Sequence, residues 1–199
     1  MPDQILDKIK NDFKDRLHLH ELLRNDLNLH LDIVRAYLLM NETIRCGHKF
    51  VMFGNGGSAT DAQHFAAELV CMFEKKRRAL PAIALTSDSA ILTAQANDFG
   101  FSSIFSRQIE ALCQPGDMVV GFSTSDVGED GHSQNIENGF LAALEKGVGS
   151  IGFFSEKTKK LLNLAHVSII VPDINTARIQ EVHREVMHIL CGLIEANIS

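Results

Sequence analysis

The stretch KFVMFGNGGS, from Lys49 to Ser58, joins a run of buried-type residues to a glycine-rich turn, and a helical pattern follows it. Such a turn between a strand and a helix lets backbone N–H groups approach an anion, and the helix dipole favours negative charge there. Farther along this helix, His64 and Glu68 are four residues apart and therefore share one face. An anion site followed by an imidazole and a carboxylate indicates chemistry on a small phosphorylated molecule.

Plainer interpretations of both features stay open. The turn matches neither the G-x-G-x-x-G fingerprint nor the lysine-bearing P-loop, which argues against dinucleotides and nucleoside triphosphates. It could be a tight turn with Ser58 as the helix N-cap. His64 and Glu68 could be an exposed pair that contributes about a few tenths of a kcal/mol, or two ligands of a borderline metal such as zinc.

The remainder of the chain alternates short apolar runs with helical stretches, which is typical of βαβ units. We therefore expect an α/β fold, a three-layer sandwich in which a five-stranded parallel sheet carries helices on both faces. Residues 4–46 are helical in pattern and end at Gly47, which can close a helix in the left-handed conformation. One domain, 1–199, is expected, with a helical segment 1–47 and an α/β core 48–199. The predicted strands are 50–53, 82–85, 118–122, 149–154 and 167–171.

Composition narrows the class of protein. The chain has 199 residues, 45% of them apolar, and a net charge of −6, which favours a globular domain and gives no broad basic surface. Lys75-Lys76-Arg77-Arg78 is interpreted as a solvated helix end, so nucleic acid is not expected as a partner. No stretch is apolar enough for a membrane span or a secretion signal, and the four scattered cysteines suit reduced thiols in the core. A cytoplasmic location is expected.

Two later segments add candidate functional groups. Ser123-Thr124-Ser125 directly follows a predicted strand, where its hydroxyls and amides could hold a phosphate without a lysine, or could form an ordinary capped turn. In the final helix, 176–197, an apolar face includes Ile189, Leu193 and also His183, which is interpreted as a core histidine. His188 lies on the opposite side, together with Glu195, and faces solvent, a cleft or another subunit.

In these motifs the chain resembles the phosphoheptose isomerases of the sugar isomerase (SIS) domain superfamily. The matching pieces run in order through nearly the whole chain: 54–58, 61–65, 68–69, 96–100, 123–125 and 178–188. The resemblance implies conversion of sedoheptulose 7-phosphate into D-glycero-D-manno-heptose 7-phosphate through an enediol, the first step towards ADP-heptose for lipopolysaccharide core. It also implies a homotetramer with active sites at subunit boundaries, packed in part through helices in 1–47.

The resemblance further implies roles for individual residues. Glu68 and His188 would be the catalytic acid/base pair, and one zinc ion per subunit would be held by His64, Glu68, Gln180 and His188. Gln180 and His188 are separated by about 12 Å of helix rise and roughly 80° around the helix, so either both reach towards an ion between them or a neighbouring chain supplies one. The implied substrate-binding residues are Asn55, Gly56, Gly57, Ser58, Asn97, Asp98, Ser123, Thr124, Ser125, Ser133 and Gln180.

The chain departs from the family pattern in two places. An apparent five-residue insertion, within Ser125 to Ser133, is expected to bring carboxylates beside the phosphate pocket and makes Ser133 the match to the last phosphate-binding serine. Met72 stands where relatives commonly have arginine, so Arg107, Arg178 or a nearby lysine could replace the lost cation.

Two other functions remain as alternatives. A non-catalytic SIS adaptor that binds the replication initiator protein would lack the carboxylate of Glu68 and the imidazole of His188, and both are present. A sugar-phosphate-sensing regulator would normally carry a DNA-binding domain, and the sequence offers no basic recognition helix for one.

Overall fold

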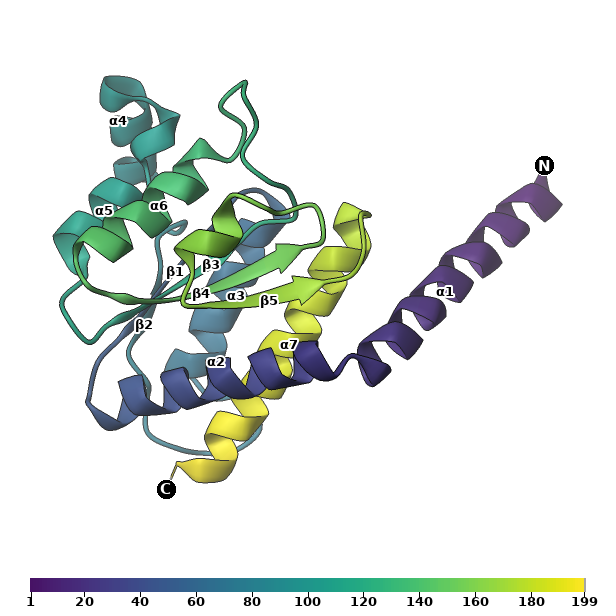
Figure 1. Cartoon of the computed structure of the whole chain (residues 1–199), viewed down its shortest axis with the longest axis horizontal. Helices are drawn as coiled ribbons and strands as arrows, with labels where there is room; N and C mark the ends of the chain where they lie inside the picture. Colours follow the sequence, from purple (N-terminus) through teal and green to yellow (C-terminus); the bar gives the residue numbers. More distant parts are fainter. Residues whose placement is uncertain (199) are drawn as a thin grey trace.

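A parallel sheet lies at the centre of the computed structural model, which describes residues 1–198 (Figure 1). Its strand order within these residues is β2-β1-β3-β4-β5, and every neighbouring pair is parallel. The three middle strands are almost entirely buried, as continuous apolar runs covered on both faces should be. The strands are β1 (Phe50–Gly54), β2 (Ala82–Ala84), β3 (Met118–Phe122), β4 (Gly149–Ser155) and β5 (Val167–Val171), within one residue of the predicted bounds.

Helices cover both faces of this sheet, which confirms the three-layer architecture (Figure 1). Successive residues of β1 alternate between the layers: Phe50 and Met52 pack in one core, whereas Val51 and Phe53 pack in the other. The first core lies beneath α2 (Leu27–Arg45), α3 (Gly57–Val70) and α7 (Thr176–Asn197). The second lies beneath α5 (Ser106–Leu112) and α6 (Gln134–Glu145), while α4 (Ser89–Phe99) contributes no buried residue.

The amino-terminal segment consists of two helices rather than one uninterrupted helix. Asp26 takes an extended conformation between α1 (Pro2–Asn25) and α2, and its carboxylate accepts a hydrogen bond from the N–H of Leu29 as the cap of α2. Gly47 has the predicted positive φ of 77°. α1 projects away from the sheet and its covering helices (Figure 1). None of the helices in residues 1–198 combines the length and the apolar character that a membrane crossing requires.

The last helix confirms its predicted bounds, but three of its residues lie on a different face from the one predicted. His183 is fully buried, its Nε2 lies 3.0 Å from the carbonyl oxygen of Phe154, and burial lowers the pKa of its imidazole to about 4. Glu195, expected on the polar side, is 4% exposed. Ile189 and Leu193, expected in the core, are 44% and 37% exposed.

The basic segment before β2 also differs from its prediction. α3 ends at Val70, so Lys75 to Arg78 belong to an irregular loop and not to a helix end. The side chain of Arg77 is 3% exposed because it pairs with the carboxylate of Glu195. Of the four cysteines, Cys113 and Cys191 are buried as predicted, whereas Cys46 and Cys71 are exposed.

Candidate active site

Helices α3 and α7 run side by side in the same direction and carry most of the candidate groups in three successive layers. At the first layer, Gly57 packs so closely on the Gln180 side chain that a Cβ at position 57 would collide with it. Gly56, just before α3, has a positive φ of 54°, which favours glycine at that position of the turn. The alternative in which Ser58 is the N-cap does not hold, because Ser58 is buried inside the first turn and Gly56 occupies the cap position.

The second layer is a charged pair that sequence reasoning did not identify. Asp61 is completely buried, and its Oδ1 accepts a 2.7 Å hydrogen bond from the guanidinium of Arg184. Burial raises the pKa of the Asp61 carboxyl, although Arg184 acts in the opposite direction. The pair lies between the two ends of the candidate site and ties α3 to α7.

The third layer brings the predicted acid/base residues together. His64 Nε2 lies 2.9 Å from Glu68 Oε1 and 3.5 Å from His188 Nε2, and the nearest ligand atoms of all three residues lie within 4.8 Å of one another. Phe73 stacks on the His188 ring, with centroids 5.2 Å apart and planes 19° apart. Partial burial, and then the neighbouring His64, lower the pKa of His188, while Glu68 acts in the opposite direction. Glu68 and His188 therefore meet within one chain.

These three side chains suit a metal ion. Two imidazoles and a carboxylate are ligands that zinc accepts, and a set of three leaves a coordination position for a substrate. Two imidazole nitrogens that face each other across 3.5 Å and a carboxylate within reach match this donor set. Gln180, the fourth predicted ligand, lies at the first layer beside Gly57 and not with the other three. Zinc binding therefore stays a prediction.

A pocket of about 260 Å³ opens at the carboxyl edge of the sheet. It lies between the turns after β1 and β3 and the beginnings of α6 and α7, which is where ligands bind in open α/β sheets. The side-chain amide of Asn55, which lines the pocket, exchanges hydrogen bonds of 2.9 Å and 2.8 Å with that of the buried Asn135. The residues that line it include nine of the predicted substrate-binding set: Asn55, Gly56, Gly57, Ser58, Ser123, Thr124, Ser125, Ser133 and Gln180.

The other two predicted substrate-binding residues lie elsewhere. Asn97 and Asp98 are on α4, where the Asn97 amide donates a 2.7 Å hydrogen bond to Asp98 Oδ1, and neither residue lines the pocket. No hydrogen bond among the described residues links either side chain to the turns after β1 and β3. A single chain therefore does not bring them to the other nine.

The inserted loop corrects the expectation that its carboxylates lie at the pocket. Asp126 accepts hydrogen bonds of 3.1 Å from the N–H of Lys160, and Asp130 accepts one of 3.0 Å from the N–H of His132. Burial opposes the shift, but the bond from Lys160 and other backbone bonds hold the pKa of Asp126 below its usual range. The insertion instead lines the pocket with His132, which sequence reasoning missed although a histidine directly before Ser133 was visible.

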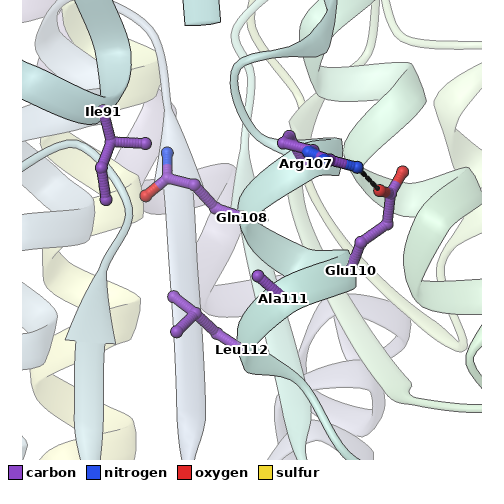
Figure 2. Close-up of a pocket in the computed structure, with 6 residues that line it drawn as sticks. All are labelled: Ile91, Arg107, Gln108, Glu110, Ala111 and Leu112. Atoms are coloured by element: carbon purple, nitrogen blue, oxygen red, sulfur yellow. Dashed lines mark hydrogen bonds and ion pairs between the residues drawn. The ribbon is translucent and has the colours of Figure 1, made fainter. Parts of the chain in front are cut away.

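The proposed replacement arginines do not line the pocket either. Arg107 is 3.1 Å from Glu110 on α5, at a separate pocket of about 510 Å³ that Ile91 also lines (Figure 2). Arg178 is bound to Asp173 at 2.6 Å and also pairs with an acidic residue of α1. Met72 is 47% exposed and has no cationic substitute among the described residues of the pocket.

Comparisons with known proteins agree with this architecture. The SIS domain family model matches residues 19–155. The phosphoheptose isomerase of Aquifex aeolicus is 44% identical over 195 residues, which cover 96% of each chain. The solved phosphoheptose isomerase of Neisseria gonorrhoeae superimposes with a TM-score of 0.87 at 35% identity and covers 96% of this chain and 99% of its own. That of Francisella tularensis gives a TM-score of 0.88 at 34% identity, over 96% and 98% of the two chains. The chain belongs to the SIS domain family and, within it, to the phosphoheptose isomerases.

Proposed function

We propose that this chain converts sedoheptulose 7-phosphate into D-glycero-D-manno-heptose 7-phosphate, in the cytoplasm, as the first step towards ADP-heptose for lipopolysaccharide core. The coarser function, isomerisation of a sugar phosphate, follows from the family. The observation that carries the proposal is the meeting of Glu68 and His188, since one ligand atom from each of His64, Glu68 and His188 lies within 4.8 Å of the other two. A carboxylate and an imidazole at this separation can act on two neighbouring carbons and their oxygens.

The proposed mechanism is proton transfer through a cis-enediol. The Glu68 carboxylate removes a proton from the carbon next to the ketose carbonyl and returns it to the former carbonyl carbon. His188 passes a proton between the two oxygens, so that the ketone becomes a hydroxyl and the terminal hydroxyl becomes the aldehyde. The stacked ring of Phe73 fixes the plane of the His188 imidazole during these transfers.

The zinc hypothesis belongs to the same proposal. His64, Glu68 and His188 would hold the ion, and Gln180 would complete the set from a second copy of the chain. When bound, zinc would supply Lewis-acid polarisation of the substrate oxygens. Among the described residues the His64 side chain has hydrogen-bond partners only in Glu68 and His188, both through Nε2, which supports a role for its imidazole at this cluster.

The arrangement of one chain supports an active site shared between subunits. Gly57 and Glu68 are about 16 Å apart along α3, with the Asp61–Arg184 pair between them. The phosphate pocket and the acid/base cluster thus lie at opposite ends of the helix. We propose a homotetramer in which neighbouring copies bring one chain's pocket to another's acid/base cluster.

The amino-terminal helices offer a surface for that assembly. α1 extends away from the sheet (Figure 1), and its exposed apolar residues have no cover within the described chain. Large exposed apolar surfaces of this kind mark protein interfaces. The exposed residues of the two helices include Ile5, Leu6, Ile9, Phe13, Leu17, Leu27, Leu31, Val34 and Leu38.

The test is incubation of the purified chain with sedoheptulose 7-phosphate in deuterated water, with and without a chelator. Product that carries deuterium at the proton-transfer carbon supports the proposal, and Glu68→Gln should remove both product and exchange. Absence of turnover, combined with tight binding to a replication initiator protein, would instead favour the adaptor function.

A further inference from the structure

The proposed phosphate pocket holds almost no charge of its own. Most of its lining consists of glycines, hydroxyls, amides and apolar groups, and among the described lining residues His132 is the only one with an ionisable side chain. A phosphate ester carries between one and two negative charges near neutral pH. Neutral donors and the helix N-termini at the pocket satisfy its oxygens but supply only partial positive charge, so a full cation would add to the binding.

His132 is held at this pocket by the inserted loop. Its Nε2 lies 2.8 Å from the hydroxyl oxygen of Ser125, which also lines the pocket. Its backbone is fixed on both sides, since its N–H donates to Asp130 and its carbonyl accepts a 3.0 Å bond from Gly128. The loop therefore fixes the backbone of His132, and the contact with Ser125 holds its imidazole at the pocket.

The base of the loop is also anchored. Asp126 accepts from the backbone N–H of Lys160, and Lys160 Nζ donates a 3.3 Å bond to the carbonyl of Val127. Ser133, which follows the loop, has the left-handed φ of 59°, an uncommon conformation for a residue other than glycine. Strained backbone of this kind persists where the surrounding structure enforces it, and it is enriched at ligand sites.

We propose that His132 is a phosphate-binding residue and that it makes the affinity of the pocket for sugar phosphates depend on pH. The protonated imidazole donates a charge-assisted hydrogen bond to a phosphate oxygen, and the Ser125 hydroxyl is then free to donate to another. The inference rests on the proposed function only in that the ligand carries a phosphate.

The charged groups around His132 do not supply this role themselves. Asp130 bonds the backbone N–H of His132, and Asp126 and Lys160 are engaged with backbone at the base of the loop. The other described lining residues are neutral. Because imidazoles change charge between about pH 5 and 8, anion affinity should fall across that range as pH rises.

The test measures binding of inorganic sulfate by calorimetry at pH 6 and pH 8.5, because sulfate keeps its double charge at both. We expect wild-type affinity to fall about tenfold between the two, the scale of one charge-assisted hydrogen bond. His132→Gln should lose about tenfold at pH 6 and show little further change at pH 8.5. His132→Arg should bind well at both pH values. His166→Gln, which changes another exposed histidine just before β5 at the opposite edge of the sheet, should behave as wild type.

Wild-type-like sulfate affinity and pH dependence in His132→Gln would overturn the inference, as would absence of sulfate binding to wild type at both pH values. The assay involves no turnover and therefore separates the two proposals. Sulfate binding that depends on His132, in a chain without isomerase activity, would leave this inference standing and remove the proposed function. Isomerase activity in a chain whose sulfate affinity does not depend on His132 would support the proposed function and remove this inference.

Discussion

Replacing Glu195 with glutamine should destabilise the protein and disturb the acid/base cluster together. The Glu195 carboxylate accepts hydrogen bonds of 2.8, 2.8 and 2.9 Å from the N–H groups of Phe73, Glu74 and Lys75. It also lies 3.0 Å from Arg77 Nε, and the two side chains are 2% and 3% exposed. The carboxylate thus holds to α7 the loop whose Phe73 stacks on His188.

Arg77 extends the same connection to α3. Its guanidinium donates hydrogen bonds of 2.6 Å to the carbonyl oxygen of Glu68 and 2.9 Å to that of Leu69. These are terminal carbonyls of α3, which lack partners within the helix. One buried ion pair therefore links the end of the helix that carries Glu68 to the helix that carries His188.

The magnitude follows from this burial. Removing one partner of a buried ion pair costs about 3–5 kcal/mol, because the other charge stays buried without compensation. Glu195→Gln keeps the shape but loses the charge, and its NH₂ group cannot accept from the loop amides. For a domain of this size, each kcal/mol lowers Tm by about 2–4 °C, so a decrease of about 6–20 °C is expected.

The assay is thermal and urea unfolding of wild type, Glu195→Gln, Arg77→Met and the double variant. The double variant should cost less than the sum of the single variants, because it leaves no unpaired buried charge. At 25 °C the folded fraction of Glu195→Gln should show a lower kcat, since Phe73 no longer holds the His188 ring. Single variants that each cost under about 1 kcal/mol, or strict additivity in the double variant, would refute the reasoning.

The pH dependence gives a second measure of the same pair. Burial opposes the shift, but the bonds from Phe73, Glu74 and Lys75, together with the charge of Arg77, lower the pKa of Glu195 from its ordinary value of 4.5. The stabilisation is therefore complete above that value and is lost as pH falls through it towards the lower folded-state pKa. Wild type should lose stability over this acidic range more steeply than Glu195→Gln.

Three further perturbations test the remaining proposals. Glu68→Gln and His188→Ala should each lower turnover about a hundredfold or more with little change in Tm, the usual scale for general acid/base groups; near-normal rates in both would remove the assignment. His64→Ala should weaken zinc binding, measured by competition with a coloured chelator, and unchanged zinc affinity would exclude His64 as a ligand. Phe13→Asp on α1 should reduce the mass measured by light scattering, whereas a mass that stays tetrameric would show that this face is not needed for assembly.

Most of the fold was accessible to sequence reasoning because local patterns encode it. β3 has the predicted bounds, since a parallel strand buried between two layers is a continuous apolar run. β5 also has the predicted bounds, because three of its five residues are valine or isoleucine on the buried face and the run ends at Val171. α7 matches its predicted range, Thr176–Asn197, because its 22 residues are long enough for the helical repeat of apolar residues to be recognised. More than one helix was predicted for residues 1–47, but the break at Asp26 was not located, because both helices beside it have the same period.

The faces of α7 were predicted less well, and Glu195 shows why. A periodicity argument assigns glutamate to solvent, because a carboxylate is buried only when donors surround it. Here the donors come from residues 73–77, more than a hundred positions earlier in the chain. No pattern within the helix contains that information, and Arg77 was misassigned to solvent for the same reason.

The site divides in the same way. Local sequence patterns were enough to predict the shared helix face of His64 and Glu68 and the turn at Gly56. That His188 lies beside them followed only from the family resemblance. His132 was missed because it lies where the chain departs from the family. The charges in the insertion suggested that its aspartates would lie at the pocket. Instead, Asp130 and Asp126 accept hydrogen bonds from the backbone N–H groups of His132 and Lys160.

The parallel course of α3 and α7 explains why one chain holds the parts of the site but does not close it. Both helices follow strands of a parallel sheet, so both begin at its carboxyl edge, where the pocket lies. Because the helices run in parallel, residues at similar distances from their starts face each other. Gly57 therefore lies beside Gln180, and about two turns farther on His64 lies beside His188. A phosphate bound at the helix starts is therefore kept away from the acid/base cluster of its own chain by the length of the helices themselves. The side chains of Glu68 and His64 are 20% and 36% exposed, so the cluster needs a cover that excludes water during proton transfer. A second subunit would provide that cover, and its own pocket would hold the substrate phosphate at the right distance.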